Sequence, residues 1–311
     1  MRRAFLAIVL FCGSGAYAST ELDMALDNVR RDCGHISDEL ADMKTMAGIN
    51  TAVTAVGTVT GGVGLATGIA KSSVDKEIEE LEKEIARLKA ERGSVPVENL
   101  TLQDEGVYNR QLLSFINSYT PVSQKEEELA AAEKKSKTLG NVRTGMLATS
   151  TATNIAGTII AANNRVKGDL KSQIDACLAS VKELSNARMQ ARVSETASES
   201  ELDYAERVVR ACDAWDTVDV SSINKKSTGA TVSSGIGAGL GLAGTITSAS
   251  ANSQSVREDG GQKEKNLNNS ANILAGGTTV ASGAAVIFNA TQIRAIKRAA
   301  TVADECEGAL K

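Results

Sequence analysis

Four cysteines are the residues of this sequence best placed to do covalent chemistry. Cys33, Cys177, Cys212 and Cys306 all lie downstream of an apparent export signal. An even number of cysteines in an exported protein favours disulfides, although four cysteines allow three pairings. Four buried free thiols are the alternative.

The export signal occupies the N-terminus. Arg2 and Arg3 precede an apolar run over residues 4–11, and Ala16-Tyr17-Ala18 fits a cleavage site of small residues. We therefore expect residues 1–18 to be removed and the mature protein to reach the periplasm, the cell envelope or the extracellular space.

Motifs for catalysis or cofactor binding are weak. Gly239-x-Gly241-x-x-Gly244 matches a dinucleotide fingerprint in form, but no predicted strand precedes it. The single histidine, His35, cannot build a histidine-based metal site or a catalytic triad. The acidic residues near Glu79 alternate with lysines and are typical of a solvated helix face. We predict a protein that is not an enzyme and holds no cofactor or metal.

Composition excludes a further class of function. The chain of 311 residues has 34 Lys+Arg and 38 Asp+Glu, a net charge of -4 with the two signs interspersed. It therefore lacks the basic surface that binds nucleic acid. Only 3% of its residues are aromatic, so a conventional globular core would be hard to build.

The sequence carries an internal duplication. Glu21-Leu22-Asp23, followed by Cys33, recurs as Glu201-Leu202-Asp203, followed by Cys212. Each half contains a cysteine-bearing segment, a zone of small residues, a polar centre, a second zone and another cysteine. Two copies of one supersecondary unit are the simplest explanation.

Hydrophobic spacing indicates that this unit is a helical hairpin. A heptad seam begins at Leu22, slips by one step after Met43 and resumes at Met46, so residues 21–91 are predicted to form one long helix. The prolines, Pro96 and Pro121, bracket the predicted reversal of the first hairpin. The seam before the slip consists of Leu22, Leu26, Val29, Cys33, Ile36, Leu40 and Met43.

Hairpin symmetry chooses among the disulfide pairings, because residues that face each other are equidistant from the turn. Cys33 and Cys177 have their midpoint at residue 105, between the two prolines. Cys212 and Cys306 have theirs at residue 259, within Glu258-Asp259-Gly260-Gly261, a strong turn signal. We predict these two bridges.

The zones of small residues cover 47–70, 144–164, 227–255 and 266–293 and carry no charge. Glycine costs about 1 kcal/mol relative to alanine within a helix, so close helix packing must offset it. The predicted helix-packing glycines are Gly57, Gly61, Gly64, Gly68, Gly235, Gly237, Gly239, Gly241, Gly244, Gly276, Gly277 and Gly283.

The sequence leaves two alternatives for the medium around these zones, a lipid bilayer and water. Each zone is long enough to span a bilayer, for which about 20 residues suffice. Large aliphatic residues are few, however, and no tryptophan or tyrosine lies beside any zone. One alternative is insertion as a hairpin or oligomer, in which partners bury polar surface together. The other is a water-soluble bundle.

Together these observations predict an all-α fold of two long antiparallel helical hairpins. The first covers 19–192 with its tip at about 93–122, and the second covers 193–311 with its turn at about 256–265. In architecture alone the chain resembles helical-hairpin translocator or pore-forming proteins. The expected partners are a lipid bilayer, other copies of the chain or another helical protein. The alternative function is a soluble periplasmic or extracellular coiled-coil scaffold or adhesin.

Overall fold

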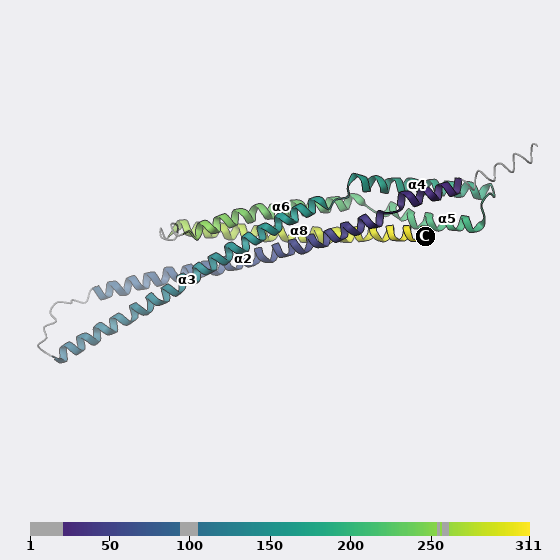
Figure 1. The fold of residues 1–311 in the computed structure, drawn as a ribbon. Helices are drawn as coiled ribbons and strands as arrows, with labels where there is room; N and C mark the ends of the chain where they lie inside the picture. The colour runs from purple at the N-terminus through teal and green to yellow at the C-terminus, as the bar shows by residue number, and fades with distance from the viewer. Residues whose placement is uncertain (1–20, 94–104, 254–255, 257–260) are drawn as a thin grey trace, which may run out of the picture. The chain divides into compact units, whose positions relative to one another are not determined.

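The fold of the described residues is all-α. The computed structural model describes residues 21–93, 105–253, 256 and 261–311, and these contain no strand. Residues 21–33 are helical, and the remaining elements follow in chain order (Figure 1): α2 (Ile36–Gly93), α3 (Glu105–Asn163), α4 (Gly168–Val193), α5 (Glu199–Asp213), the 3-10 helix η1 (Ala214–Thr217), α6 (Val220–Ala251) and α8 (Gln262–Leu310).

The chain divides into two compact units. Unit 1 contains the chain up to Ala55, Ile155–Gly235 and Gly283–Lys311, and unit 2 contains Val56–Asn154 and Ile236–Ser282. Both units therefore take segments from both halves of the sequence. The boundary between two hairpins near residue 192 stays a prediction.

The four long helices pack antiparallel. Within unit 2, Ser150 and Ser136 of α3 donate hydrogen bonds to Gly57 and Asp75 of α2, so residue numbers fall on one helix as they rise on the other. Gly244 and Leu240 of α6 lie beside Leu274 and Gly277 of α8 in the same sense. Figure 1 shows α6 and α8 side by side.

Two disulfides cross-link unit 1. Cys33 bonds to Cys177 and Cys212 to Cys306, the same pairs that the hairpin midpoints predict. All four cysteines are at most 1% exposed and belong to one apolar core. Among the large members of that core are Leu22, Val29, Ile36, Leu40, Leu170, Ile174, Val181, Leu184, Val208, Trp215 and Ile296.

The predicted helix over residues 21–91 is interrupted, so that prediction was wrong in detail. The chain turns at Gly34 and His35, where His35 has φ of 72°, and α2 begins at Ile36. Gly34 N–H donates to Arg30 O at 3.1 Å, which closes the first helix. A residue in the left-handed region one or two positions after a helix is a common way to end it. The His35 side chain is solvated, with 87% exposed.

Local signals account for the start of α5. Ser198 accepts a hydrogen bond from Glu201 N–H while the Glu201 carboxylate accepts one from Ser198 N–H, which completes a capping box. This arrangement satisfies two backbone donors that a helix N-terminus leaves open. The side-chain and backbone hydrogen bonds from Ser198 also hold the pKa of Glu201 below its usual value.

The tip of the first hairpin differs from the prediction. Pro121 lies inside α3, which already begins at Glu105, so residues 105–120, which the prediction placed in the tip, are part of a long helix. Proline is tolerated in a long helix at the cost of one backbone hydrogen bond. The predicted reversal near Pro96, and the turn at residues 257–260, lie outside the described residues.

Replacing Cys33 and Cys177 with alanine tests the first cross-link. We expect the free energy of unfolding to fall by about 2–5 kcal/mol, since the bridge closes a long loop in the unfolded chain. Chemical unfolding followed by circular dichroism measures the change. Peptide mapping without reduction should recover the bridges Cys33–Cys177 and Cys212–Cys306 from the unaltered protein. A Cys33–Cys212 peptide would contradict the antiparallel packing at this end.

Candidate functional site

The inward face of α2 changes in kind along the helix. In the uncharged segment 47–70, the buried positions are Ala47, Asn50, Thr54, Gly57, Gly61, Gly64 and Gly68. Every Val, Ile and Leu of that segment is exposed or half-buried instead. The large aliphatic side chains therefore point outward, and small or polar side chains point inward.

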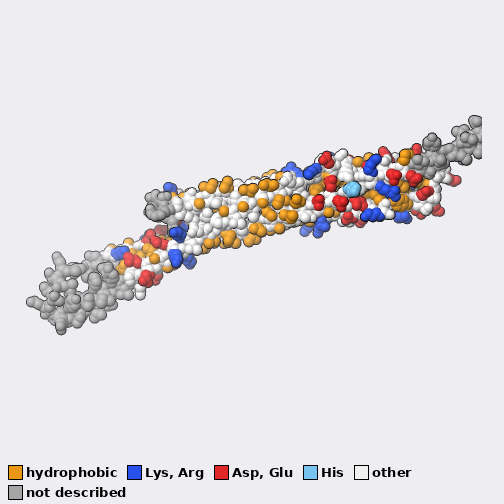
Figure 2. Space-filling view, viewed as in Figure 1, with side chains coloured by type: hydrophobic (Ala, Val, Ile, Leu, Met, Phe, Trp, Pro, Cys, Tyr) orange, Lys and Arg blue, Asp and Glu red, His pale blue; other side chains and the backbone are white. Residues whose placement is uncertain are grey.

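The other three long helices repeat this arrangement. Among the described residues of 144–164, 227–251 and 266–293, Leu147 is the only buried Val, Ile, Leu, Met or Phe. Large aliphatic and aromatic side chains stand on the outer faces, as Figure 2 shows over α6 and α8. The more exposed ones are Ile155, Ile159, Val232, Ile236, Leu242, Ile246, Ile273, Val280, Ile287 and Phe288.

The slip predicted after Met43 does not occur. Burial continues in steps of three and four from Leu40 through Ala47 and Asn50 to Lys71, so the heptad register is unbroken there. Met46 is 52% exposed because it lies outside that register. The sequence-based seam followed the hydrophobic residues, and in this stretch those residues point away from the neighbouring helices.

At its disulfide-bonded end, unit 1 has the polarity that is usual for proteins in water, with apolar side chains inside and charged side chains outside. There the inward positions are large and apolar, as at Leu22, Val29 and Leu40. The outer face carries charges, among them Arg30, which is paired with Asp27 at 3.1 Å. The continuous heptad thus presents an apolar interior at this end and an apolar exterior over 47–70. Apolar side chains on an outer face need an apolar medium or a partner to cover them.

The predicted packing glycines fall into two groups. A Cβ added at Gly241 would lie 2.6 Å from Thr151 Oγ1, and one at Gly57 would lie 2.8 Å from Thr153 Oγ1. Gly61, Gly64, Gly68, Gly237, Gly244 and Gly277 also lie against neighbouring helices. Gly235 and Gly239 instead meet open space, and Gly276 has only a loose contact. Gly283 is half-buried. Gly157, at which a Cβ would lie 2.7 Å from Thr54 Cγ2, was not among the predicted residues.

Polar side chains fill the interior of unit 1 where the uncharged segments pack together. Asn50 Nδ2 donates to Asn289 Oδ1 at 2.9 Å, and Asn289 Nδ2 donates to Thr54 Oγ1 at 3.3 Å. Gln292 Nε2 donates to the backbone oxygen of Asn164 at 2.8 Å. These side chains are all at most 4% exposed. Three of their polar atoms, Asn50 Oδ1, Asn164 Nδ2 and Gln292 Oε1, are buried without a hydrogen-bond partner.

Unit 2 buries a network of ions. Lys71 Nζ, fully buried, lies 2.7 Å from Asp75 Oδ2 and 3.0 Å from Glu264 Oε1. Arg143, also fully buried, donates to Ser248 Oγ at 2.8 Å and to Asn268 Oδ1 at 2.7 Å. A third hydrogen bond joins Arg143 Nη1 to Asn272 Oδ1 at 3.3 Å, and Asn268 Nδ2 donates to Asp75 Oδ2 at 3.2 Å. The two buried cations are balanced by two carboxylates that are half-buried, with 29% of the Asp75 side chain and 20% of the Glu264 side chain exposed.

Sequence analysis did not identify Lys71 and Arg143 as interior residues. Both lie at the ends of uncharged segments, where charged residues ordinarily face solvent. The available signal was the heptad register, since Lys71 follows Gly64 and Gly68 at steps of four and three. The predicted seam missed this signal because it followed the hydrophobic residues and not the heptad register.

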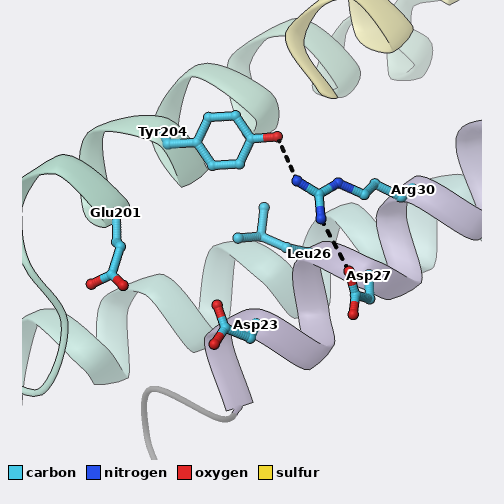
Figure 3. Close-up of a pocket in the computed structure, with 6 residues that line it drawn as sticks. All are labelled: Asp23, Leu26, Asp27, Arg30, Glu201 and Tyr204. Atoms are coloured by element: carbon cyan, nitrogen blue, oxygen red, sulfur yellow. Dashed lines mark hydrogen bonds and ion pairs between the residues drawn. The ribbon is translucent and has the colours of Figure 1, made fainter. Parts of the chain in front are cut away.

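A shallow pocket of about 420 Å³ lies in unit 1 (Figure 3), between the helix over 21–33 and α5. Arg30 Nη2 donates to Tyr204 Oη at 3.1 Å, and Tyr204 in turn donates to the backbone oxygen of Leu310. The hydrogen bond to Tyr204, with a further one to Asp27, raises the pKa of Arg30. The pocket is lined by Asp23, Leu26, Asp27, Arg30, Glu201 and Tyr204. They include no nucleophile paired with a base, so the pocket offers no catalytic arrangement.

The other residues considered for chemistry are not brought together. Gly239, Gly241 and Gly244 lie within α6, whereas a dinucleotide fingerprint needs the turn between a strand and a helix. The sulfurs of Cys33, Cys177 and Cys306 lie within 4.8 Å of one another. All three are in disulfides, however, and a metal ligand must be a free thiolate.

Two of the described helical stretches, Glu21–Glu91 and Gln262–Leu310, are long and apolar enough to cross a membrane. Their most apolar windows have mean hydropathies of 1.4 and 1.5, and 28% of each window is buried. The core helix of a soluble protein would bury most of such a window. Length and composition therefore agree with the outward placement of the aliphatic side chains.

Comparison with known proteins finds no relative: no family model matches the chain, and neither a curated protein nor a solved structure matches it.

Alanine at Gly241 and at Gly239 gives a matched test of helix packing on α6. We expect Gly239→Ala to stabilise the fold by about 0.5–1 kcal/mol, because the site is open and alanine favours the helix. Gly241→Ala should destabilise it, because the new methyl group meets Thr151. Thermal unfolding of both variants measures the difference. Equal shifts in the same direction would contradict the packing around Gly241.

Lys71→Met tests the buried ions, with Lys83→Met as its control. Both lysines pair with a carboxylate four residues away on α2, but the Lys83 side chain is 72% exposed. Loss of Lys71 leaves Asp75 and Glu264 without their nearest cation, so we expect a loss of about 3–5 kcal/mol. Lys83→Met should change the free energy of unfolding by less than about 1 kcal/mol. Urea unfolding measures both free energies, and an equal loss in the two variants would contradict the buried position of Lys71.

Proposed function

We propose that this protein is an exported, non-catalytic helical bundle whose four uncharged segments insert together into a lipid bilayer. The observation that carries the proposal is the reversed polarity of those segments, with small and polar residues inside and Val, Ile, Leu and Phe outside. Lipid-facing helices expose aliphatic side chains and keep polar ones toward the bundle interior. In water the same outer surface would be an unusually large apolar patch.

The lengths suit a bilayer. Segment 47–70 contains 24 residues, which is about 36 Å at 1.5 Å per residue. The hydrocarbon layer is about 30 Å thick. An exposed lysine, Lys44, lies close before the N-terminal end of the segment. Long cationic side chains can reach the headgroup level from the end of a spanning helix.

Insertion depends on the bundle, not on single helices. A helix with six glycines and five threonines in 24 residues gains little from transfer into hydrocarbon. Its inward polar groups need partners, which the other helices supply, as Asn289 does for Asn50. Small residues such as Gly57 and Gly241 allow the close approach that membrane helices use for packing.

Four crossings fix a topology. An even number of crossings leaves the disulfide-bonded end of the chain on one side and residues 71–143 on the other. The bridges Cys33–Cys177 and Cys212–Cys306 favour the oxidising side, which is the exported side. The charged part of α2 and α3, held by pairs such as Lys89–Glu126 at 2.7 Å, then extends from the opposite face.

The polar interior supports a pore-like or translocator-like role. Asn50 Oδ1, Ser234 Oγ and Gln292 Oε1 are buried without partners, so the interior has hydrogen-bonding capacity that water or a polar substrate can use. The packed arrangement corresponds to a closed state, because side chains fill the space between the helices. Opening would require the helices to separate along their glycine faces.

The alternative is a soluble exported scaffold. The apolar, disulfide-linked core of unit 1 and the salt-bridged coiled coil of α2 and α3 favour it, since both are typical of proteins in water. In that case the apolar outer faces would meet other copies of the chain or another helical protein.

Membrane fractionation separates the two functions. We expect the expressed mature protein to stay in the membrane pellet after an alkaline carbonate wash. Ile236→Lys together with Val280→Lys should release it, because a charge at the centre of a spanning helix costs about 2.5–3.5 kcal/mol. The matched control, Met189→Lys with Val193→Lys, changes exposed apolar residues outside the uncharged segments and should remain in the pellet. Release of the unaltered protein would favour the scaffold.

A further inference from the structure

Unit 1 carries a collar of cations next to its uncharged segments. Beyond the segment on α8, the first three charged residues are all cations, and the two that precede the segment on α6 are lysines. The two charged residues that follow α3, Arg165 and Lys167, are also cations. The collar consists of Lys44, Arg165, Lys167, Lys225, Lys226, Arg294, Lys297 and Arg298.

Hydrogen bonds place these cations at one level of unit 1. Val166 N–H donates to Asn224 Oδ1 at 2.8 Å, which brings Arg165 and Lys167 to the level of Lys225 and Lys226. Gln292 donates to the backbone oxygen of Asn164, which places Arg294 at the level of Arg165. Asn50 of α2 donates to Asn289 of α8. Lys44 lies six residues before Asn50 and Arg294 five residues after Asn289, and because the two helices are antiparallel, both cations lie on the same side of this pair.

The collar is free to bind an anion. All eight side chains belong to exposed residues except that of Lys226, which is half-buried. Within the described residues, none of the eight forms an ion pair within 4.0 Å. Each of the four stretches has an acid two to six residues away along the chain, namely Asp42, Asp169, Asp219 and Asp304. Lys225 lies near Asp219 and contributes to lowering its pKa, after the hydrogen bond from Ser221.

The opposite ends of the same segments are different. Lys71 and Arg143 point inward there and are satisfied by Asp75, Glu264, Asn268 and Ser248. Exposed Lys263 and Lys265 also border the segment on α8 at that end, on either side of Glu264. Positive charge there is mixed with acidic residues, whereas the collar gathers eight cations beside the apolar outer faces.

We propose that this collar binds the headgroups of anionic phospholipids in the leaflet that faces the disulfide-bonded end of the chain. The inference rests on the proposed membrane insertion. A ring of lysine and arginine at the edge of an apolar surface matches the negative phosphates above the acyl chains. The partner is accordingly a bilayer rich in anionic lipid, and the collar determines which membrane the bundle enters.

Vesicle flotation of the full mature protein tests the collar. The probes are vesicles of phosphatidylcholine alone and vesicles that also contain phosphatidylglycerol. The collar variant combines Arg165→Gln, Lys226→Gln and Arg294→Gln. The matched control combines Lys182→Gln, Arg192→Gln and Lys311→Gln, which remove the same charge from unit 1 away from the collar.

We expect the unaltered protein and the control to bind the anionic vesicles more tightly, and the collar variant to lose on the order of a hundredfold in that binding at low salt. Binding to neutral vesicles, and resistance to carbonate, should be the same for all three. Equal binding to both vesicle types, or an anionic preference that survives in the collar variant, would overturn the collar while leaving insertion intact. Failure to bind either vesicle would overturn insertion and the collar together.

Discussion

Close approach of antiparallel helices is the constraint on which the rest of this structure depends. Gly57, Gly157 and Gly241 are positions where a single methyl group would meet a side chain of the next helix at 2.6–2.8 Å. Small residues suit such inward positions, and the chain places Gly, Ala, Ser or Thr at most of the buried positions in its uncharged segments. The large aliphatic side chains are therefore displaced to the outside. An apolar exterior is thus a direct consequence of tight packing with small residues, and it needs an apolar medium or partner to cover it.

Helices built this way have little hydrophobic stabilisation of their own, which explains where the stabilising contacts are. The apolar core lies at the disulfide-bonded end, where Trp215 and the cysteines are at most 2% exposed. Within the uncharged segments, amide and hydroxyl pairs such as Asn50–Asn289 and Ser282–Asn154 replace apolar contacts. Such pairs are directional, so they specify register between helices where alternating small residues alone would permit sliding. The ions around Lys71 and Arg143 do the same in unit 2, since a misaligned register would leave a buried charge without its partner.

The sequence was sufficient to predict the helical class, the disulfide pairs and the antiparallel sense, because these follow from symmetry about a turn and from heptad spacing. It was insufficient for the register beyond Met43, where hydrophobicity and burial separate: Ile49 and Val56 look like core residues and are 47% and 49% exposed. The inward positions of Lys71 and Arg143 were missed for the same reason. The interruption at Gly34 and His35 depends on a left-handed residue that spacing does not reveal. Contacts between the two sequence halves, such as Lys71 with Glu264, depend on pairing over long separations, about which the pattern of one helix says nothing.

The distribution of charge gives the two ends of the uncharged segments different roles. Lys71 is paired with carboxylates and Arg143 is held by hydroxyl and amide groups, so the helices of unit 2 can slide or part only by breaking buried polar contacts. Where Arg165, Lys226 and Arg294 remain unpaired, the charges can respond to an external surface without any cost to internal packing. The disulfides lie on that same side and restrain separation of the bonded helices, Cys33 from Cys177 and Cys212 from Cys306. Unit 1 is thus restrained covalently and unit 2 by its ions. Along the sequence of α2, Asn50 and the packing glycines lie between Cys33 and Lys71, so the stretch with the least apolar burial is also the one that neither restraint holds directly.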